Sequence, residues 1–365
     1  MSNQSNIPAY AKASLISIGI LAFLCTMYLA KGIIVPLIYA TIISIVLSPV
    51  VDFLVRKKIK LILAITITLL ILIIVSTLCI TLLLSQASLF SESFPKLLGK
   101  WDDLFLQSEH WISNTFNISQ DKLNGWTTEL NNDLLSNSSF MIGITLMNLG
   151  NILIILFLIP VYIFMILYYR EHILEFIHKL FRANKLNTLN EVLNSSKKII
   201  QSYLVGLLLE ALIIATLNSC SLLIIGINYA ILLGVLGAII NVIPFIGGIV
   251  AVAMPMAIAL ITKSPSHAFF VLEAYLLIQF TDNHFIIPKV VASKVKLNAL
   301  VSIIVVLLGG ALWGIPGMFL SIPMVAILKV IFDRIDGLKP WGFLLGNVVS
   351  TKPINILTKR KWFWS

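Results

Sequence analysis

Five ionisable or polar side chains lie inside or at the end of long apolar stretches, where such groups are rare. Glu210 stands in "GLLLEALII", Glu273 stands in "FVLEAYLL", and Asp282, Asn283 and His284 precede "FIIPK". A charged group at the bilayer centre costs at least about 2.5 kcal/mol, so it should face a cavity or a partner. We therefore take these residues as candidates for coupling transport to a proton or a sodium ion, or for contacting a polar solute.

Each candidate also has a structural interpretation. An embedded carboxyl can form a helix–helix hydrogen bond that fixes packing, and for Glu210 this alternative stays as open as a role in carrying protons. Glu273 lies within two turns of a polar loop and can extend to the membrane surface. Asp282 and His284 can instead cap the chain toward Lys289.

Two apolar runs are interrupted by helix breakers. Residues 229–262 contain "NVIPFIGG", and residues 299–331 contain "GGALWGIPG". Proline removes a backbone donor and glycine frees the chain to turn. Backbone groups released at membrane depth must line a cavity or be buried in protein, and a pair of broken segments points to a transporter binding site. The predicted cavity residues are Asn241, Pro244, Phe245, Gly247, Gly248, Gly309, Gly310, Gly314 and Pro316. A close-packed glycine contact, as the GxxxG spacing of Gly310 and Gly314 permits, is the structural alternative.

Motifs of soluble enzymes are missing from the sequence. We find no Walker A loop, GxGxxG, GxSxG, HExxH or CxxC pattern. Asp282 lacks the glycine pattern of an intramembrane aspartyl protease. His172 and His178 are six positions apart and face different sides of a helix, which disfavours a metal site. We expect no catalytic residue, no metal and no cofactor.

The composition indicates which kind of secondary structure carries these candidate residues. Of 365 residues, 59% are hydrophobic and only 12% charged, and the mean hydropathy is +1.00. A soluble protein has about 25% charged residues, and about 20 apolar residues cross a bilayer. The sequence therefore predicts an all-α polytopic membrane protein with about eight embedded segments, including the two broken hairpins. Cys25, Cys79 and Cys220 all lie in apolar runs and are expected to be buried thiols.

The expected organisation follows the alternation of apolar and polar stretches. The amino-terminal half comprises three membrane helices in 1–84, an extracytoplasmic region of two amphipathic helices in 85–139, and a fourth membrane helix in 140–169 with a kink at Pro160. A cytoplasmic helical linker follows in 170–198. The carboxyl-terminal half comprises a membrane core in 199–335, with hairpins 229–262 and 299–331, and a cytoplasmic tail in 336–365.

The positive charges predict the orientation. Lysine and arginine collect in cytoplasmic loops, and "RKKIK" at 56–60 therefore predicts cytoplasmic termini. On that assignment 21 of the 26 basic residues share the cytoplasmic side. Residues 85–139 hold three lysines against seven acids. The net charge of +10 is thus explained by topology, and a nucleic-acid partner is not needed.

The same rule favours hairpins over single crossings for the broken runs. Lys289, Lys294 and Lys296 are cytoplasmic only if residues 229–262 turn back on themselves, and the basic tail is cytoplasmic only if residues 299–331 do the same. The single-span alternative stays open. The two hairpins are expected to enter the membrane from opposite faces.

In two of these segments the chain resembles the autoinducer-2 exporter family, also called the PerM-like permeases. The resemblance is carried by "IPFIGG" (243–248) and by the block from Asp282 to Ile335. It implies a homo-oligomeric, multi-pass protein of the cell (inner) membrane that exports a furanone signal or exchanges sodium for protons. Phe245 and Gly248 stand where family members often carry tyrosine and a second proline. We expect a secondary transporter of a small polar solute; a passive channel and a non-transporting membrane scaffold are the alternatives.

The topology is tested by lysine accessibility. Lys289 and Lys294 should be labelled only from the cytoplasmic side by a membrane-impermeant amine reagent, because the hairpin returns the chain outward before 268–287 crosses inward. Labelling from outside would contradict the hairpin topology.

Overall fold

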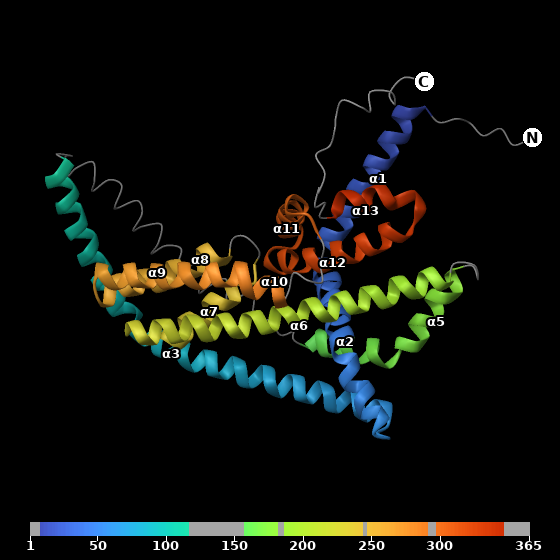
Figure 1. Cartoon of the computed structure of the whole chain (residues 1–365), viewed down its shortest axis with the longest axis horizontal. Coiled ribbons are helices and arrows are strands. Elements are labelled where there is room, and N and C mark those ends of the chain that lie inside the picture. The colour runs from blue at the N-terminus through green and yellow to red at the C-terminus, as the bar shows by residue number, and fades with distance from the viewer. Residues whose placement is uncertain (1–7, 117–156, 182–185, 244–246, 291–296, 347–365) are drawn as a thin grey trace, which may run out of the picture.

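The computed structural model describes residues 8–116, 157–181, 186–243, 247–290 and 297–346. Regular structure in these ranges is helical, apart from one isolated bridge between Leu297 and Gly346. The prediction of an all-α chain is confirmed. Figure 1 shows the helices arranged around one long central helix, α6.

Three helices form the amino-terminal part. They are α1 (Ala9–Leu29), α2 (Lys31–Arg56) and α3 (Leu61–Phe116). Helix α3 continues without a break through position 85, where we expected the membrane helix to end and a separate amphipathic helix to begin. The reason is local, because no proline or glycine stands between Leu61 and Phe94 to stop the helix. The second expected amphipathic helix lies outside the described residues.

A sharp bend separates the fourth membrane segment from the polar stretch that follows it. The helix Phe157–Tyr168 and helix α5 (Arg170–Leu180) are bent by 64° about Tyr169. The kink predicted at Pro160 lies next to residues outside the described ranges and stays a prediction. Arg170 Nη1 donates to Asp52 Oδ1 at 2.5 Å and ties this bend to α2.

The first broken run forms α7 (Ala230–Asn241) and α8 (Gly247–Thr262), which pack against each other. Ser264 caps the next helix, α9 (Pro265–Thr281), by accepting a hydrogen bond from the His267 amide. A π-helical turn, η2 (Asp282–Ile286), and the short helix α10 (Ile287–Val290) continue α9.

The second broken run forms α11 (Ala299–Trp313) and α12 (Ile315–Arg334), followed by η3 (Asp336–Leu338) and α13 (Lys339–Leu345). Gly314 joins the two long helices with φ +67°, a conformation that strains residues with a side chain. Helix α12 has 20 residues, about 30 Å, and is long enough to span a bilayer alone, whereas α11 has only 15 residues.

Helix α6 (Leu186–Ile225) carries two separate buried clusters along its length. Its carboxyl-terminal half packs through Leu222 with α7, α8 and α9. Its middle part packs through Ile200, Tyr203, Leu204 and Leu207 with α2, α11 and α12. We call these the first and the second core. A third cluster joins α2, α3 and the helix Phe157–Tyr168.

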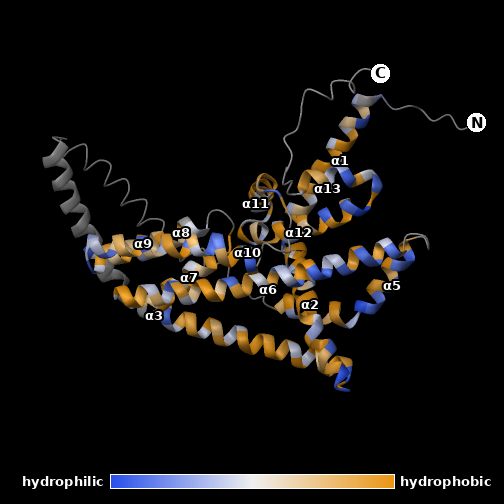
Figure 2. Cartoon of the chain, viewed as in Figure 1, coloured by the Kyte–Doolittle hydropathy of each residue, from blue (hydrophilic) through white to orange (hydrophobic). Residues whose placement is uncertain are grey.

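Many apolar side chains stay on the surface of the chain, as expected of a protein that lipid surrounds. Figure 2 shows long hydrophobic stretches along α2, α3 and α6. Among the described residues five helices are long and apolar enough to cross a membrane, or six if the bent pair counts as one span. Three shorter apolar helices accompany them, Ala230–Asn241, Val250–Thr262 and Ala299–Trp313. The expected number of about eight is therefore not established.

The three cysteines are a correction. Cys25, Cys79 and Cys220 are exposed on the chain and not buried as we expected. An apolar environment does not require burial inside a membrane protein, because lipid solvates apolar side chains as well as a protein core does.

The contact between α11 and α12 generates a prediction at Gly309. A Cβ there would lie 2.5 Å from the Gly317 carbonyl oxygen and closer still to Ser321 Oγ, so the backbones must separate. Gly309→Ala should cost about 1–3 kcal/mol and lower the melting temperature in detergent. Gly310→Ala is the matched control, because its Cβ would meet the flexible end of Met318. Equal melting temperatures for the two variants would contradict the close approach.

Candidate polar site between the two cores

Three polar side chains from different parts of the sequence come together where the first core meets the second. Glu210 lies in the middle of α6, Asn241 ends α7, and Asp282 begins the π-helical turn η2. We call these three residues the polar junction. Helix α6 contacts α7, α9 and α10, which brings the three positions to one region of the fold.

Asp282 is the most enclosed member of the polar junction. Its side chain is completely buried, and Oδ2 accepts a hydrogen bond of 3.0 Å from Asn241 Nδ2. Its other oxygen, Oδ1, has no hydrogen-bond partner among the described residues. π-helical turns are rare and often occur at functional sites, and this one begins at Asp282.

Glu210 is buried on the neighbouring helix, with 5% of its surface exposed. No ion pair or hydrogen bond to its carboxyl is formed within the described ranges. Helix α6, which carries Glu210, contacts α9 and α10, and these two helices flank the π-helical turn that begins at Asp282. Glu210 stands between Leu207, which belongs to the second core, and Leu222, which belongs to the first.

The break in the first apolar run also lies at the boundary between the two cores. Val242, which follows Asn241, packs against the second core, and Ile287, just after the π-helical turn, does the same. The polar junction is therefore placed where two packed units of the protein meet.

Two buried carboxyl groups in one region of a membrane protein are suited to hold a proton or a cation. Both cannot be ionised at close range without a neutralising positive charge. The part of the chain that the structure describes contains no group of three or more histidine, cysteine, aspartate or glutamate residues that could hold a metal ion. A cation at the polar junction would therefore need amide or backbone oxygens as additional ligands.

The glycines of the first hairpin allow close approach. A Cβ on Gly247 would lie 2.6 Å from Asn241 Cα and closer to the Ile240 carbonyl oxygen. A Cβ on Gly248 would collide with the Gln279 side-chain amide. In this conformation both positions are closely packed against neighbouring residues. Pro244 and Phe245 lie outside the described residues.

The candidate residues of the second hairpin lie against other helices. The Pro316 carbonyl accepts a hydrogen bond of 3.2 Å from Tyr39 on α2, and Trp313 Nε1 donates to Met27 O of α1 at 3.0 Å. Gly309 and Gly310 pack against α12. Gly314 has open space around it. The described hydrogen bonds of this tip thus join it to α1 and α2.

The remaining coupling candidates are exposed. Glu273, Asn283 and His284 all have accessible side chains, and His284 stacks on Phe280. Among the described residues Asp282 makes no ion pair with Lys289, which is exposed. Asp282 is turned to Asn241 on α7, and not to this lysine.

Three polar residues near the first hairpin were missed by sequence reasoning. Gln279 lies against Gly248, and Asn218 and Tyr275 both lie against Gly237. Asn218 Oδ1 and the Tyr275 hydroxyl are buried without a hydrogen-bond partner among the described residues. Amide and phenol groups inside apolar runs were the available signal, but we considered mainly charged groups.

These features define a multi-pass α-helical membrane protein with buried carboxyl groups at the boundary of two helical units. Comparison with known proteins gives the family. Residues 18–337 match the AI-2E family transporter model, and the chain belongs to that family. It is a transporter or permease by this membership.

Several relatives are similar over most of their length. The chain is 24% identical to the putative transport protein YueF of Bacillus subtilis (strain 168), over 82% of this chain and 83% of that one. It is 26% identical to the AI-2 transport protein TqsA of Escherichia coli (strain K12), over 91% and 95% of the two chains. A shorter match, 27% identical over 51% of this chain and 53% of the relative, is to the putative permease PerM of Escherichia coli (strain K12).

The hydrogen bond between Asn241 and Asp282 can be tested by stability. Asn241→Ala leaves the buried carboxyl without its partner and should cost about 1–3 kcal/mol. Asn283→Ala is the control, because Asn283 is exposed next to Asp282 and has only a 3.4 Å contact with Gln279. The measurement is the melting temperature in detergent. A smaller loss for Asn241→Ala than for Asn283→Ala would show that this bond does not hold the junction.

Proposed function

We propose that the protein is a secondary transporter of a small polar solute, and that Glu210 and Asp282 couple transport to a proton or a sodium ion. The observation that carries this proposal is the pair of buried carboxyl groups, which have no cationic partner among the described residues. Such groups are costly in a membrane and are retained mainly where an ion or a substrate moves.

The solute is an autoinducer-2-like signal. This part rests on the family and on the printed name of the relative TqsA, an AI-2 transport protein. Polar groups at the first hairpin, among them Asn241 and Gln279, offer hydrogen bonds to a hydroxylated compound. The predicted cavity residues Asn241, Gly247 and Gly248 then line its path.

Coupling follows from the position of the carboxyl pair. Binding of a proton or sodium ion removes the repulsion between Glu210 and Asp282 and lets the two cores approach. Release of the ion restores the repulsion and lets the first hairpin, with α9, move relative to α2, α11 and α12. The glycine contacts at Gly247 and Gly248 open in one of these states, which gives alternating access.

The predicted orientation fits this arrangement. From Pro265 to Val290 the continuous helix of α9, η2 and α10 is about 38 Å long, enough to cross a hydrocarbon core of about 30 Å. Lys289 then reaches the cytoplasmic boundary, and both chain termini face the cytoplasm. We propose a homo-oligomer as the working form, as the family resemblance implies.

Two alternatives predict different transport. A passive channel would show a flux that neither saturates with solute nor depends on an ion gradient. A membrane scaffold would move no solute, and Gly247→Leu would damage only its assembly. Saturable, gradient-dependent uptake in proteoliposomes excludes both.

The coupling role is tested by Glu210→Gln. This change keeps the shape of the side chain but removes the ionisable group, so solute flux should lose its dependence on a proton or sodium gradient. We expect gradient-driven uptake into proteoliposomes to fall by about tenfold or more, which corresponds to at least 1.4 kcal/mol of coupling free energy.

Glu273→Gln is the matched control, since Glu273 is an exposed glutamate on α9, and this variant should keep its coupling. Gradient-dependent uptake that is unchanged in Glu210→Gln would refute the coupling role. If both variants kept the uptake and the saturation with solute of the wild type, the protein would still be a solute transporter, but other groups would bind the coupling ion.

A further inference from the structure

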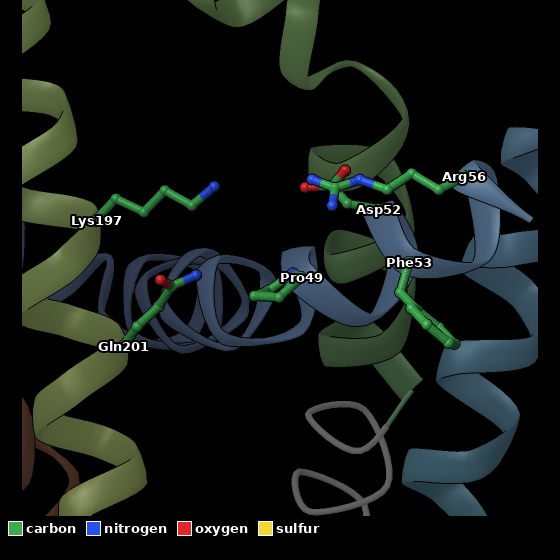
Figure 3. Close-up of a pocket in the computed structure, with 6 residues that line it drawn as sticks. All are labelled: Pro49, Asp52, Phe53, Arg56, Lys197 and Gln201. Atoms are coloured by element: carbon green, nitrogen blue, oxygen red, sulfur yellow. The ribbon is translucent and has the colours of Figure 1, made fainter.

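A groove between α2 and α6 lies away from the polar junction. Its volume is about 390 Å³, and it is lined by Pro49, Asp52, Phe53, Arg56, Lys197 and Gln201. Figure 3 shows Lys197 and Gln201 extending from α6 on one side, with Asp52 and Arg56 on α2 opposite them. The transport proposal uses none of these residues.

A proline explains why the groove has this form. Pro49 has no N–H group, so the Ile45 carbonyl one turn earlier lacks its helical donor. Gln201 Nε2 donates to that carbonyl at 2.7 Å, and Ser48 Oγ donates to it at 3.0 Å. The bond from Gln201 joins α6 to α2 beside the groove. Lys197 lies one turn away on α6 and also lines the groove.

The charges around the groove are not balanced. Asp52 is the one lining carboxylate, and it is already paired with Arg170 at 2.5 Å. Arg56 and Lys197 form no ion pair with any residue in the described ranges. Two cations therefore line one groove, and among the described residues the one lining carboxylate, Asp52, is paired with Arg170.

The groove lies at the boundary between membrane and water. Arg56 ends the apolar helix α2, and Lys197 stands just before the apolar part of α6. Phe53 is 56% exposed beside them and gives the groove an apolar wall, with Lys57 Nζ 5.1 Å from its ring centroid. An occupant should therefore have an anionic head and an apolar body.

We propose that this groove binds the phosphate headgroup of an anionic phospholipid. Arg56 provides a planar guanidinium that can bind two phosphate oxygens at once, and Lys197 provides a point charge from the opposite wall. The acyl chains lie along Phe53 and the adjacent apolar surface of α2. Basic pockets between membrane helices are suited to such headgroups, and this end of the bundle is the predicted cytoplasmic end.

The experiment uses the full chain in detergent and measures phosphatidylglycerol binding by native mass spectrometry. We expect the double variant Arg56→Gln with Lys197→Gln to bind this lipid about 10- to 30-fold more weakly than wild type. The control is the pair Lys58→Gln with Lys60→Gln, which removes the same charge from the adjacent exposed turn but leaves the groove unchanged. It should keep wild-type affinity.

Further probes identify the source of the phosphate. Phosphatidylcholine should bind weakly to all variants, and soluble glycerol phosphate should not compete at millimolar concentration. Unchanged phosphatidylglycerol affinity in the groove variant, or an equal loss in the control pair, would overturn the site. Full competition by glycerol phosphate would overturn the lipid as occupant. Because gradient-driven uptake is measured separately, a failure here leaves the transport proposal standing, and the reverse also holds.

Discussion

A carboxyl group near the middle of a membrane helix is costly unless protein encloses it, and in this chain that constraint acts on α6. Glu210 is enclosed because the first core covers one half of the helix and the second core covers the other. The hairpin of α7 and α8, together with α9, supplies the first cover, and α2 with α11 and α12 supplies the second. The positions of both broken hairpins thus depend on one long helix and on the polar group at its middle.

The breaks in the apolar runs have separate physical effects. At Gly309 and Gly247 the missing side chain lets two backbones approach, and at Gly314 it permits a positive φ. Asn241 ends α7 at the break and turns its amide to Asp282, which would otherwise be buried without any hydrogen bond. A similar contact occurs on α2, where Pro49 leaves the Ile45 carbonyl without its helical donor. Gln201 on α6 donates a hydrogen bond to that carbonyl. At Asn241 and at Pro49, a polar group released or buried in a helix finds a hydrogen-bond partner on another helix.

Much of the architecture was predictable from local pattern. Apolar runs of membrane length predicted the helices, and Gly and Pro within them predicted the breaks before Gly247 and at Gly314. The burial of Glu210 and Asp282 followed from the cost of a charge in lipid. The continuity of α3 beyond position 85 did not follow, because we took the change in polarity as a helix end, while the backbone needs a breaker to stop. The prediction of buried cysteines was wrong for a related reason, since an apolar run does not indicate whether lipid or protein covers a side chain.

The sequence by itself determined that this protein is an all-α membrane protein, where its apolar runs break, and which positions within those runs carry carboxyl groups. Those properties depend on side-chain chemistry and on spacing along the chain. Only the tertiary structure decided that Asn241 bonds Asp282, that α6 brings Glu210 to the same region of the fold, and that Glu273, Asn283 and His284 are exposed. Residues 210, 241 and 282 are far apart in sequence, and they meet because α6, α7 and the turn after α9 pack together, which no periodicity within a single helix specifies.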